Sequence, residues 1–125
     1  MAYKVSKERF ESLVEAAYAE LPRDFANRLE NIAIVIEDVP TRYDAEIVGV
    51  PVNQLLGLFR GVPYRTGKSF FDIPPALPDE IYIFQRNIEA ICNNEADLVA
   101  EIRQTLVHEV GHYFGLSEDD LAQYE

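Results

Sequence analysis

Sulfur and imidazole are scarce in this sequence: its 125 residues include one cysteine, one methionine and two histidines, and tryptophan is absent. The single cysteine, Cys92, excludes an internal disulfide and agrees with a reducing compartment, so we expect it to be a small buried apolar side chain. Long apolar runs are also absent, since the longest, Ile32–Ile36 and Ile47–Val52, fall far below the roughly 20 residues of a membrane-spanning helix. No apolar segment of the signal-peptide type follows the charged N-terminus. We therefore expect a cytoplasmic protein that has no membrane partner.

Basic residues are scarce as well. The chain has 11 basic against 22 acidic residues and a net charge of −11, so its long-range field repels polyanions and nucleic acid is not an expected partner. A solvated acidic surface that keeps the protein soluble accounts for the excess of carboxylates. The length suffices for one packed core and is short for two. We expect a single domain over residues 1–125, with a monomer as the starting assumption.

Hydrophobic spacing predicts an α+β fold. Ser6 is a favourable N-cap for a helix whose apolar residues recur at intervals of three and four up to Leu21, and Pro22 would end that helix. A short helical turn is expected around Phe25 and Leu29. Stretches rich in β-branched or aromatic residues predict a small sheet of about three strands: Ile32–Val39, Leu55–Arg60 and Glu80–Gln85.

Two connections and a helical C-terminal part complete the predicted layout. Residues 40–51 mix Pro, Asp, Tyr and Gly, which predicts a loop with an extended piece at Glu46–Val50. A longer irregular connection from Gly61 to Pro78 has a length that often borders a functional cleft. A long helix from about Glu95 to Phe114, followed by a short terminal helix, completes the α+β order.

Both histidines lie in the segment HEVGH that begins at His108. At about 100° per residue, His108 and His112 lie about 40° and one helical turn apart, so their imidazoles can bind a single ion from one rigid helix. Glu109 projects beside them, where its carboxylate could accept a proton from a metal-activated water. The pattern HExxH on a helix therefore predicts a zinc site in which Glu109 is the general base.

The alternative interpretation is that His108 and His112 are core histidines with a glutamate between them. The distribution of polar and apolar residues around the same helix tests this alternative. A polar strip beside His108 is expected to face a cleft or solvent, and it contains Glu101, Gln104 and Thr105. The apolar arc lies roughly opposite and contains Val99, Ile102, Leu106, Val110 and Tyr113. This separation of faces favours the zinc site.

A catalytic zinc site needs a third protein ligand. Gly115 can end the helix in a left-handed conformation and turn the chain back toward the metal. In the extended signature HExxHxxGxxH the third ligand falls ten residues after the first, a position that Glu118 occupies here, and Asp119 is the alternative. Glu101 is disfavoured because seven helical residues separate it from His108 by about 10 Å along the axis. The acids after Gly115 could also complement the dipole of the terminal helix, and both roles can hold together.

With the segment HExxHxxG, the chain resembles the short bacterial zincin-like metallopeptidases, also described as minimal zincins. The similarity extends to the first helix, to residues 31–38, and to the segments LLGLF from Leu55 and PDEIYIF from Pro78. The resemblance implies a compact zincin-like domain with its site on the long C-terminal helix, and zinc peptidase activity. One departure is Glu118, where family members typically have aspartate. Because Met1 is the only methionine, the Met-turn of metzincins has no counterpart.

The sequence thus predicts a zinc-dependent metallopeptidase, acting on a peptide or protein substrate, in which His108, His112 and Glu118 bind zinc. A non-catalytic metal-binding or interaction protein on the same frame is one alternative. A zinc endoribonuclease with the related spacing HxxxHxxxxxH is another, but such enzymes have a histidine where Glu118 stands and lack the glutamate at Glu109. The net charge also disfavours RNA.

A peptide substrate could add to an exposed strand. Residues Ile81–Gln85 are the candidate edge, because they precede the helix with the zinc motif. The alternative is that this strand is central and fully paired.

Overall fold

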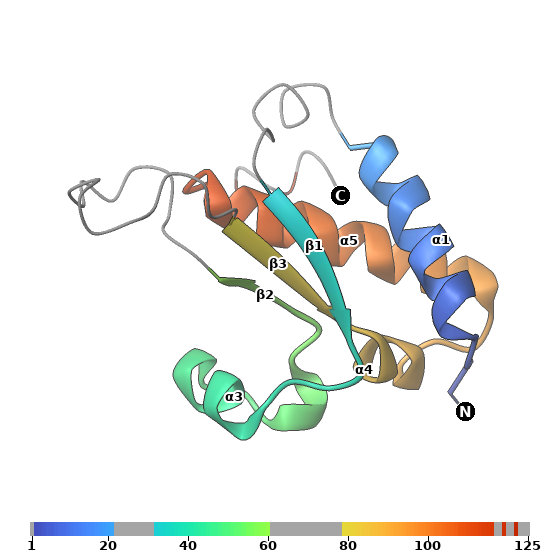
Figure 1. Ribbon diagram of the computed structural model, residues 1–125, viewed down its shortest axis with the longest axis horizontal. Coiled ribbons are helices and arrows are strands. Elements are labelled where there is room, and N and C mark those ends of the chain that lie inside the picture. The colour runs from blue at the N-terminus through green and yellow to red at the C-terminus, as the bar shows by residue number, and fades with distance from the viewer. Residues whose placement is uncertain (1, 22–31, 61–78, 117–118, 120–121, 123–125) are drawn as a thin grey trace.

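The computed structural model describes residues 2–21, 32–60, 79–116, 119 and 122. Four α-helices, a 3-10 turn and three strands follow one another in this part of the chain (Figure 1). They are α1 (Lys7–Ala19), β1 (Ile32–Glu37), α3 (Arg42–Val48), η1 (Val52–Gln54), β2 (Gly57–Arg60), β3 (Asp79–Phe84), α4 (Gln85–Ala90) and α5 (Glu95–Tyr113). The α+β class and the three-stranded sheet are confirmed. The predicted features at Pro22, at Phe25 and Leu29, and between Gly61 and Pro78 lie outside the described residues, as does most of the predicted terminal helix.

The sheet has the order β1-β3-β2. β1 pairs with β3 in parallel, with Ile34 opposite Ile81, and β2 pairs with β3 antiparallel, with Phe59 opposite Ile81. The prediction that Ile81–Gln85 forms an edge strand is therefore wrong, and the alternative of a central strand holds. The physical reason is burial: Ile81, Ile83 and Phe84 are almost fully buried, and a central position pairs their backbone groups on both sides.

The long helix α5 crosses one face of the sheet and packs against β2, β3 and α1 (Figure 1). Its buried stripe joins Ile81 and Ile83 of the sheet and Phe10 of α1 in one core, and consists of Leu98, Ile102, Leu106, Val107 and Val110. Most of the predicted apolar arc is confirmed. Val99 is an exception, because it is 40% exposed: the stripe follows Leu98, which lies about 100° around the helix from Val99.

α1 follows the sequence prediction closely. The Ser6 side chain caps it by accepting a hydrogen bond from the Arg9 backbone N–H at 3.0 Å, and its buried face includes Phe10, Val14 and Ala17. Cys92, in the turn before α5, is fully buried as expected. Burial, together with the nearby charges of acidic residues, raises the pKa of its thiol to about 11.

α3 was not predicted, because the sequence indicated a loop with an extended piece at Glu46–Val50. The helix is fixed at its ends: Thr41 accepts a hydrogen bond from the Asp44 backbone N–H at 3.0 Å, and Gly49 ends it in the left-handed region at φ 87°. The buried Asp44 carboxylate pairs with the Arg60 guanidinium of β2. α3 has no continuous apolar face, and Ala45 is its only buried apolar residue. The sequence of α3 therefore lacks the helical spacing of apolar residues from which a helix is predicted.

α4 continues directly from β3 and was also not predicted. Its buried side chains are largely polar and reach distant parts of the chain. Glu89 accepts a hydrogen bond from the Val5 backbone N–H at 2.9 Å, and Asn87 donates to the carbonyl oxygens of Val52 and Leu55 at 2.7 and 2.8 Å. α4 therefore positions the segment that leads into β2. Nowhere in the described part of the chain does a helix have the length and apolarity needed to span a membrane.

Candidate functional site

The helix α5 brings His108, Glu109 and His112 together on a rigid support. The Asn94 side chain caps its first turn by accepting a hydrogen bond from the Asp97 backbone N–H at 2.8 Å. At the other end the Gly115 backbone N–H donates to the His112 carbonyl at 3.0 Å, and Gly115 has a φ of 74°. The expected left-handed glycine is therefore present just after the second histidine.

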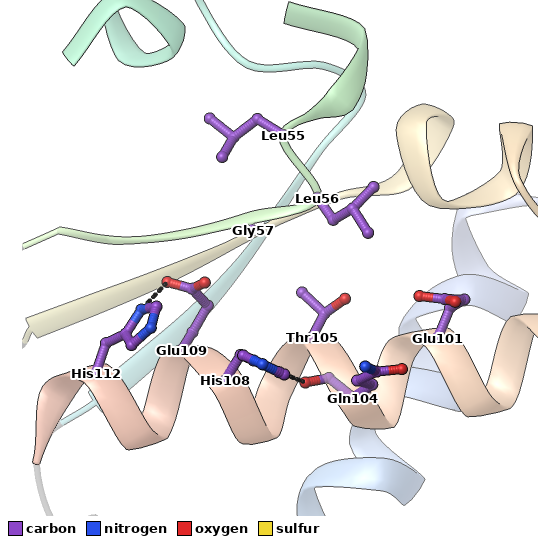
Figure 2. A pocket seen from close by; sticks show the side chains of 9 residues that line it. All are labelled: Leu55, Leu56, Gly57, Glu101, Gln104, Thr105, His108, Glu109 and His112. Atoms are coloured by element: carbon purple, nitrogen blue, oxygen red, sulfur yellow. Dashed lines mark hydrogen bonds and ion pairs between the residues drawn. The ribbon is translucent and has the colours of Figure 1, made fainter. Parts of the chain in front are cut away.

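The polar face of α5 forms one wall of a pocket of about 250 Å³ (Figure 2). The facing wall is the short segment of Leu55, Leu56 and Gly57 at the start of β2. Along α5 the lining residues are Glu101, Gln104, Thr105, His108, Glu109 and His112. The predicted polar strip thus lines a cavity, which lies where α5 faces the start of β2.

The two imidazoles lie one helical turn apart, with ring centroids 6.3 Å apart and planes at 81°. The His108 ring turns toward the Gln104 backbone carbonyl, whose oxygen lies 3.1 Å from Nδ1. The His112 ring turns toward Glu109, and its Nδ1 lies 3.9 Å from the carboxylate (Figure 2). The two rings are thus directed at different neighbours on their own helix. The His112 side chain is 50% exposed.

The contact at Gln104 favours one tautomer of His108. A carbonyl oxygen only accepts hydrogen bonds, so this contact is a hydrogen bond when Nδ1 of His108 carries the proton. In that tautomer the lone pair is on Nε2, the nitrogen that histidine commonly presents to a metal when Nδ1 donates to a carbonyl.

Glu109 lies between α5 and β2, and its side chain is only 13% exposed. The reason it fits there is Gly57: a Cβ at that position would come within 2.7 Å of Thr105 Cγ2 and 3.2 Å of Glu109 Cγ. A side chain at Gly57 would therefore push against the Glu109 side chain. A lone glycine in a strand pattern is the sequence signal for such a close approach, although the sequence analysis did not use it.

The third predicted ligand, Glu118, lies outside the described residues, and the alternative, Asp119, is exposed. Within the described residues, no three His, Cys, Asp or Glu side chains lie close enough together to hold one metal ion. Glu101, disfavoured as a ligand because of its distance along the helix, lines the same pocket as the histidines.

Comparison with known proteins gives a family and a fold. Residues 29–125 match the model of a family described as zincin-like metallopeptidase. A solved structure of a conserved hypothetical protein from Thermus thermophilus aligns with a TM-score of 0.56 and 24% sequence identity, covering 96% of this chain and 100% of that one. At this identity the likeness concerns the fold alone. No curated protein matches the chain significantly.

Proposed function

The chain belongs to the zincin-like metallopeptidase family, and from that premise we propose that it is a zinc-dependent peptidase with Glu109 as general base. His108, His112 and Glu118 are the proposed zinc ligands. The observation that supports the proposal most is that both imidazoles and the Glu109 carboxylate line one pocket on the polar face of α5. A metallopeptidase-like role follows from the family; the named residues and the peptide substrate are our proposal.

The two histidines of this pocket are donors that fit zinc. Two imidazoles from one helix, completed by a carboxylate, are a ligand set that catalytic zinc sites use, with an open position left for water or substrate, and Glu118 is our proposal for that carboxylate. The contact of Nδ1 with Gln104 favours the His108 tautomer whose lone pair is on Nε2. When bound, zinc supplies a Lewis acid that polarises the scissile carbonyl.

The remaining chemistry belongs to Glu109. Its carboxylate takes a proton from the attacking water as the new C–O bond forms, and passes that proton to the departing amine nitrogen as the C–N bond breaks. The 13% exposure of its side chain keeps competing water away from this proton transfer. Gly57 contributes by leaving room for the carboxylate against β2.

The substrate would enter along β2. Since β3 is central, β2 is the edge strand that borders the pocket in the described part of the sheet, and its first residue Gly57 is part of the pocket wall. A peptide extended beside β2 could pair with its outward backbone groups and place one carbonyl next to Glu109.

The decisive experiment compares Glu109→Gln with Glu46→Gln, a change of equal charge at an exposed position of α3. Untagged proteins are analysed for zinc and incubated with a diverse peptide library. We expect the Glu109 variant to keep its zinc and lose at least about a hundredfold of its cleavage rate, as for removal of a general base, while the control matches the original protein. Undiminished cleavage by the Glu109 variant would refute the proposed base.

The third ligand is tested in the same way with two neighbouring acids. Glu118→Ala should lower the zinc content well below one ion per chain, because two imidazoles alone leave a catalytic site one protein ligand short. Asp119→Ala, the matched control, should leave it unchanged. The reverse result would assign the ligand to Asp119.

A further inference from the structure

The end of the pocket away from the histidines is acidic, and we infer that it receives a basic side chain of the substrate. The site is the Glu101 carboxylate, and the ligand class is a peptide with Lys or Arg within three residues of the bond that is cleaved. This inference rests on the proposed peptidase function and adds a substrate preference to it.

The first support is the position of Glu101. It lies in the same pocket as His108 and Glu109, seven residues before His108 and therefore about 10 Å away along the helix axis. In Figure 2 its carboxylate turns along α5 toward Thr105, on the side of the helix that faces Leu56. Glu101 thus marks one end of the cavity, and the proposed catalytic residues mark the other.

The second support is the lack of a compensating charge. Among the described residues, no hydrogen bond or ion pair is formed by the Glu101 side chain, unlike Glu95 and Glu89, which pair with arginines. The described lining of the pocket contains no lysine or arginine, and its only other carboxylate is Glu109. A cation that enters would therefore meet an acidic group that is not already paired with a described residue, in a chain whose net charge of −11 attracts cations.

The third support is the apolar wall. Leu55 and Leu56 face the polar strip of α5 across the pocket, and Asn87 holds the Leu55 carbonyl at 2.8 Å. Lysine and arginine bury an aliphatic stem along apolar surface while their charged end reaches a polar partner. The wall of Leu55 and Leu56 therefore suits the aliphatic stem of such a side chain, and Glu101 suits its charged end.

The distance sets the position of the basic residue. An extended peptide advances about 3.3 Å per residue, so the span of about 10 Å from His108 to Glu101 corresponds to about three residues, or fewer when a long side chain covers part of the way. The preference should therefore be confined to one side of the scissile bond and to its first three positions.

The test uses octapeptides blocked at both ends, in which a single Lys is moved along an otherwise neutral sequence. In Glu101→Gln, kcat/KM for the Lys peptides should fall about threefold to tenfold, as for a partly buried charge pair, while neutral peptides are cleaved as before. Glu101→Lys should favour peptides with Glu at the same position. Glu46→Gln is the control for net charge, and unfolding curves check that the variants remain folded.

Binding separates this inference from the proposed function. In a Glu109→Gln background, fluorescence anisotropy of a labelled Lys octapeptide measures affinity without cleavage, and adding Glu101→Gln should weaken it by a similar factor. If the protein cleaves peptides without preference for Lys or Arg, or if Glu101→Gln affects neutral and basic peptides equally, the inference is overturned and the peptidase remains. If nothing is cleaved, the anisotropy result alone decides the inference: equal affinities overturn it.

Discussion

The helices α5 and α3 have similar residues at both ends but differ in how much of their surface is buried. Each has a side-chain N-cap, Asn94 or Thr41, and each is followed by a glycine in the left-handed region, Gly115 or Gly49. α5 packs on α1, β2 and β3 and buries a continuous apolar stripe. α3 leaves two large apolar side chains, Tyr43 and Ile47, 69% and 65% exposed.

The comparison separates the contribution of local capping to helix stability from the contribution of tertiary packing. A cap is worth about 1 kcal/mol in either place, and a helix of seven residues is too short to be stable by itself in water. α3 is therefore held by its ion pair between Asp44 and Arg60, whereas α5 is held by its buried face. The proposed catalytic residues lie on the helix whose position is fixed by the core, which keeps their spacing constant.

The largest effect should come from breaking the packing of α5. Leu106→Ala removes a fully buried side chain and should lower the free energy of unfolding by about 2–5 kcal/mol. The matched truncation on α3, Ile47→Ala, should change it by less than about 0.5 kcal/mol. Urea denaturation followed by circular dichroism measures both. Equal losses in the two variants would show that α3 is as much a part of the core as α5.

A smaller effect is expected where α5 touches β2. Gly57→Ala adds a methyl group within 2.7 Å of Thr105 Cγ2, which should cost about 1–3 kcal/mol of stability and slow peptide cleavage by displacing Glu109. Thr105→Ser removes the closest clashing methyl, so the double variant should regain part of the stability, while the contact of the new methyl with Glu109 Cγ at 3.2 Å keeps cleavage slow. Additive losses in the double-mutant cycle would argue against direct contact as the cause.

The smallest effect should come from loosening α3. Asp44→Asn keeps the size of the side chain but removes the charge that pairs with Arg60, at a cost of about 1 kcal/mol. Because α3 has little other packing, the loss should appear as faster amide hydrogen exchange in α3 with no change in α5. Glu46→Gln, the same loss of charge two residues away, should leave both helices unchanged. Faster exchange throughout the chain would mean that the ion pair stabilises the whole fold.

The same contrast explains which parts of the fold could be predicted. α1 and α5 were found because their apolar residues recur at helical spacing, and the strands because their composition is typical of strands. α3 and α4 were missed because their stability depends on polar contacts between distant residues, such as Asn87 with Val52 and Leu55. The central position of β3 was given only as the alternative to an edge strand, because the order of strands in a sheet depends on how the whole chain packs.

For the candidate site, helical angles alone predicted that His108 and His112 lie away from the apolar arc of α5 with Glu109 beside them, and all three line the pocket. The facing wall could not be predicted, because it depends on where β2 comes to lie. The acidic end at Glu101 followed only once that wall was known. The roles of these residues in zinc binding and catalysis stay predictions that the variants above decide.

The buried thiol of Cys92 makes the protein well suited to site-specific labelling. Thiolates are the species that react with maleimides and iodoacetamides, and with a pKa of about 11 and no exposed surface this cysteine stays inert near neutral pH. A second cysteine introduced at an exposed position such as Tyr43 would then be the sole point of attachment for a fluorophore or spin label. Motion of α3 relative to the sheet could be followed in the otherwise unaltered chain, with no need to remove a natural cysteine first.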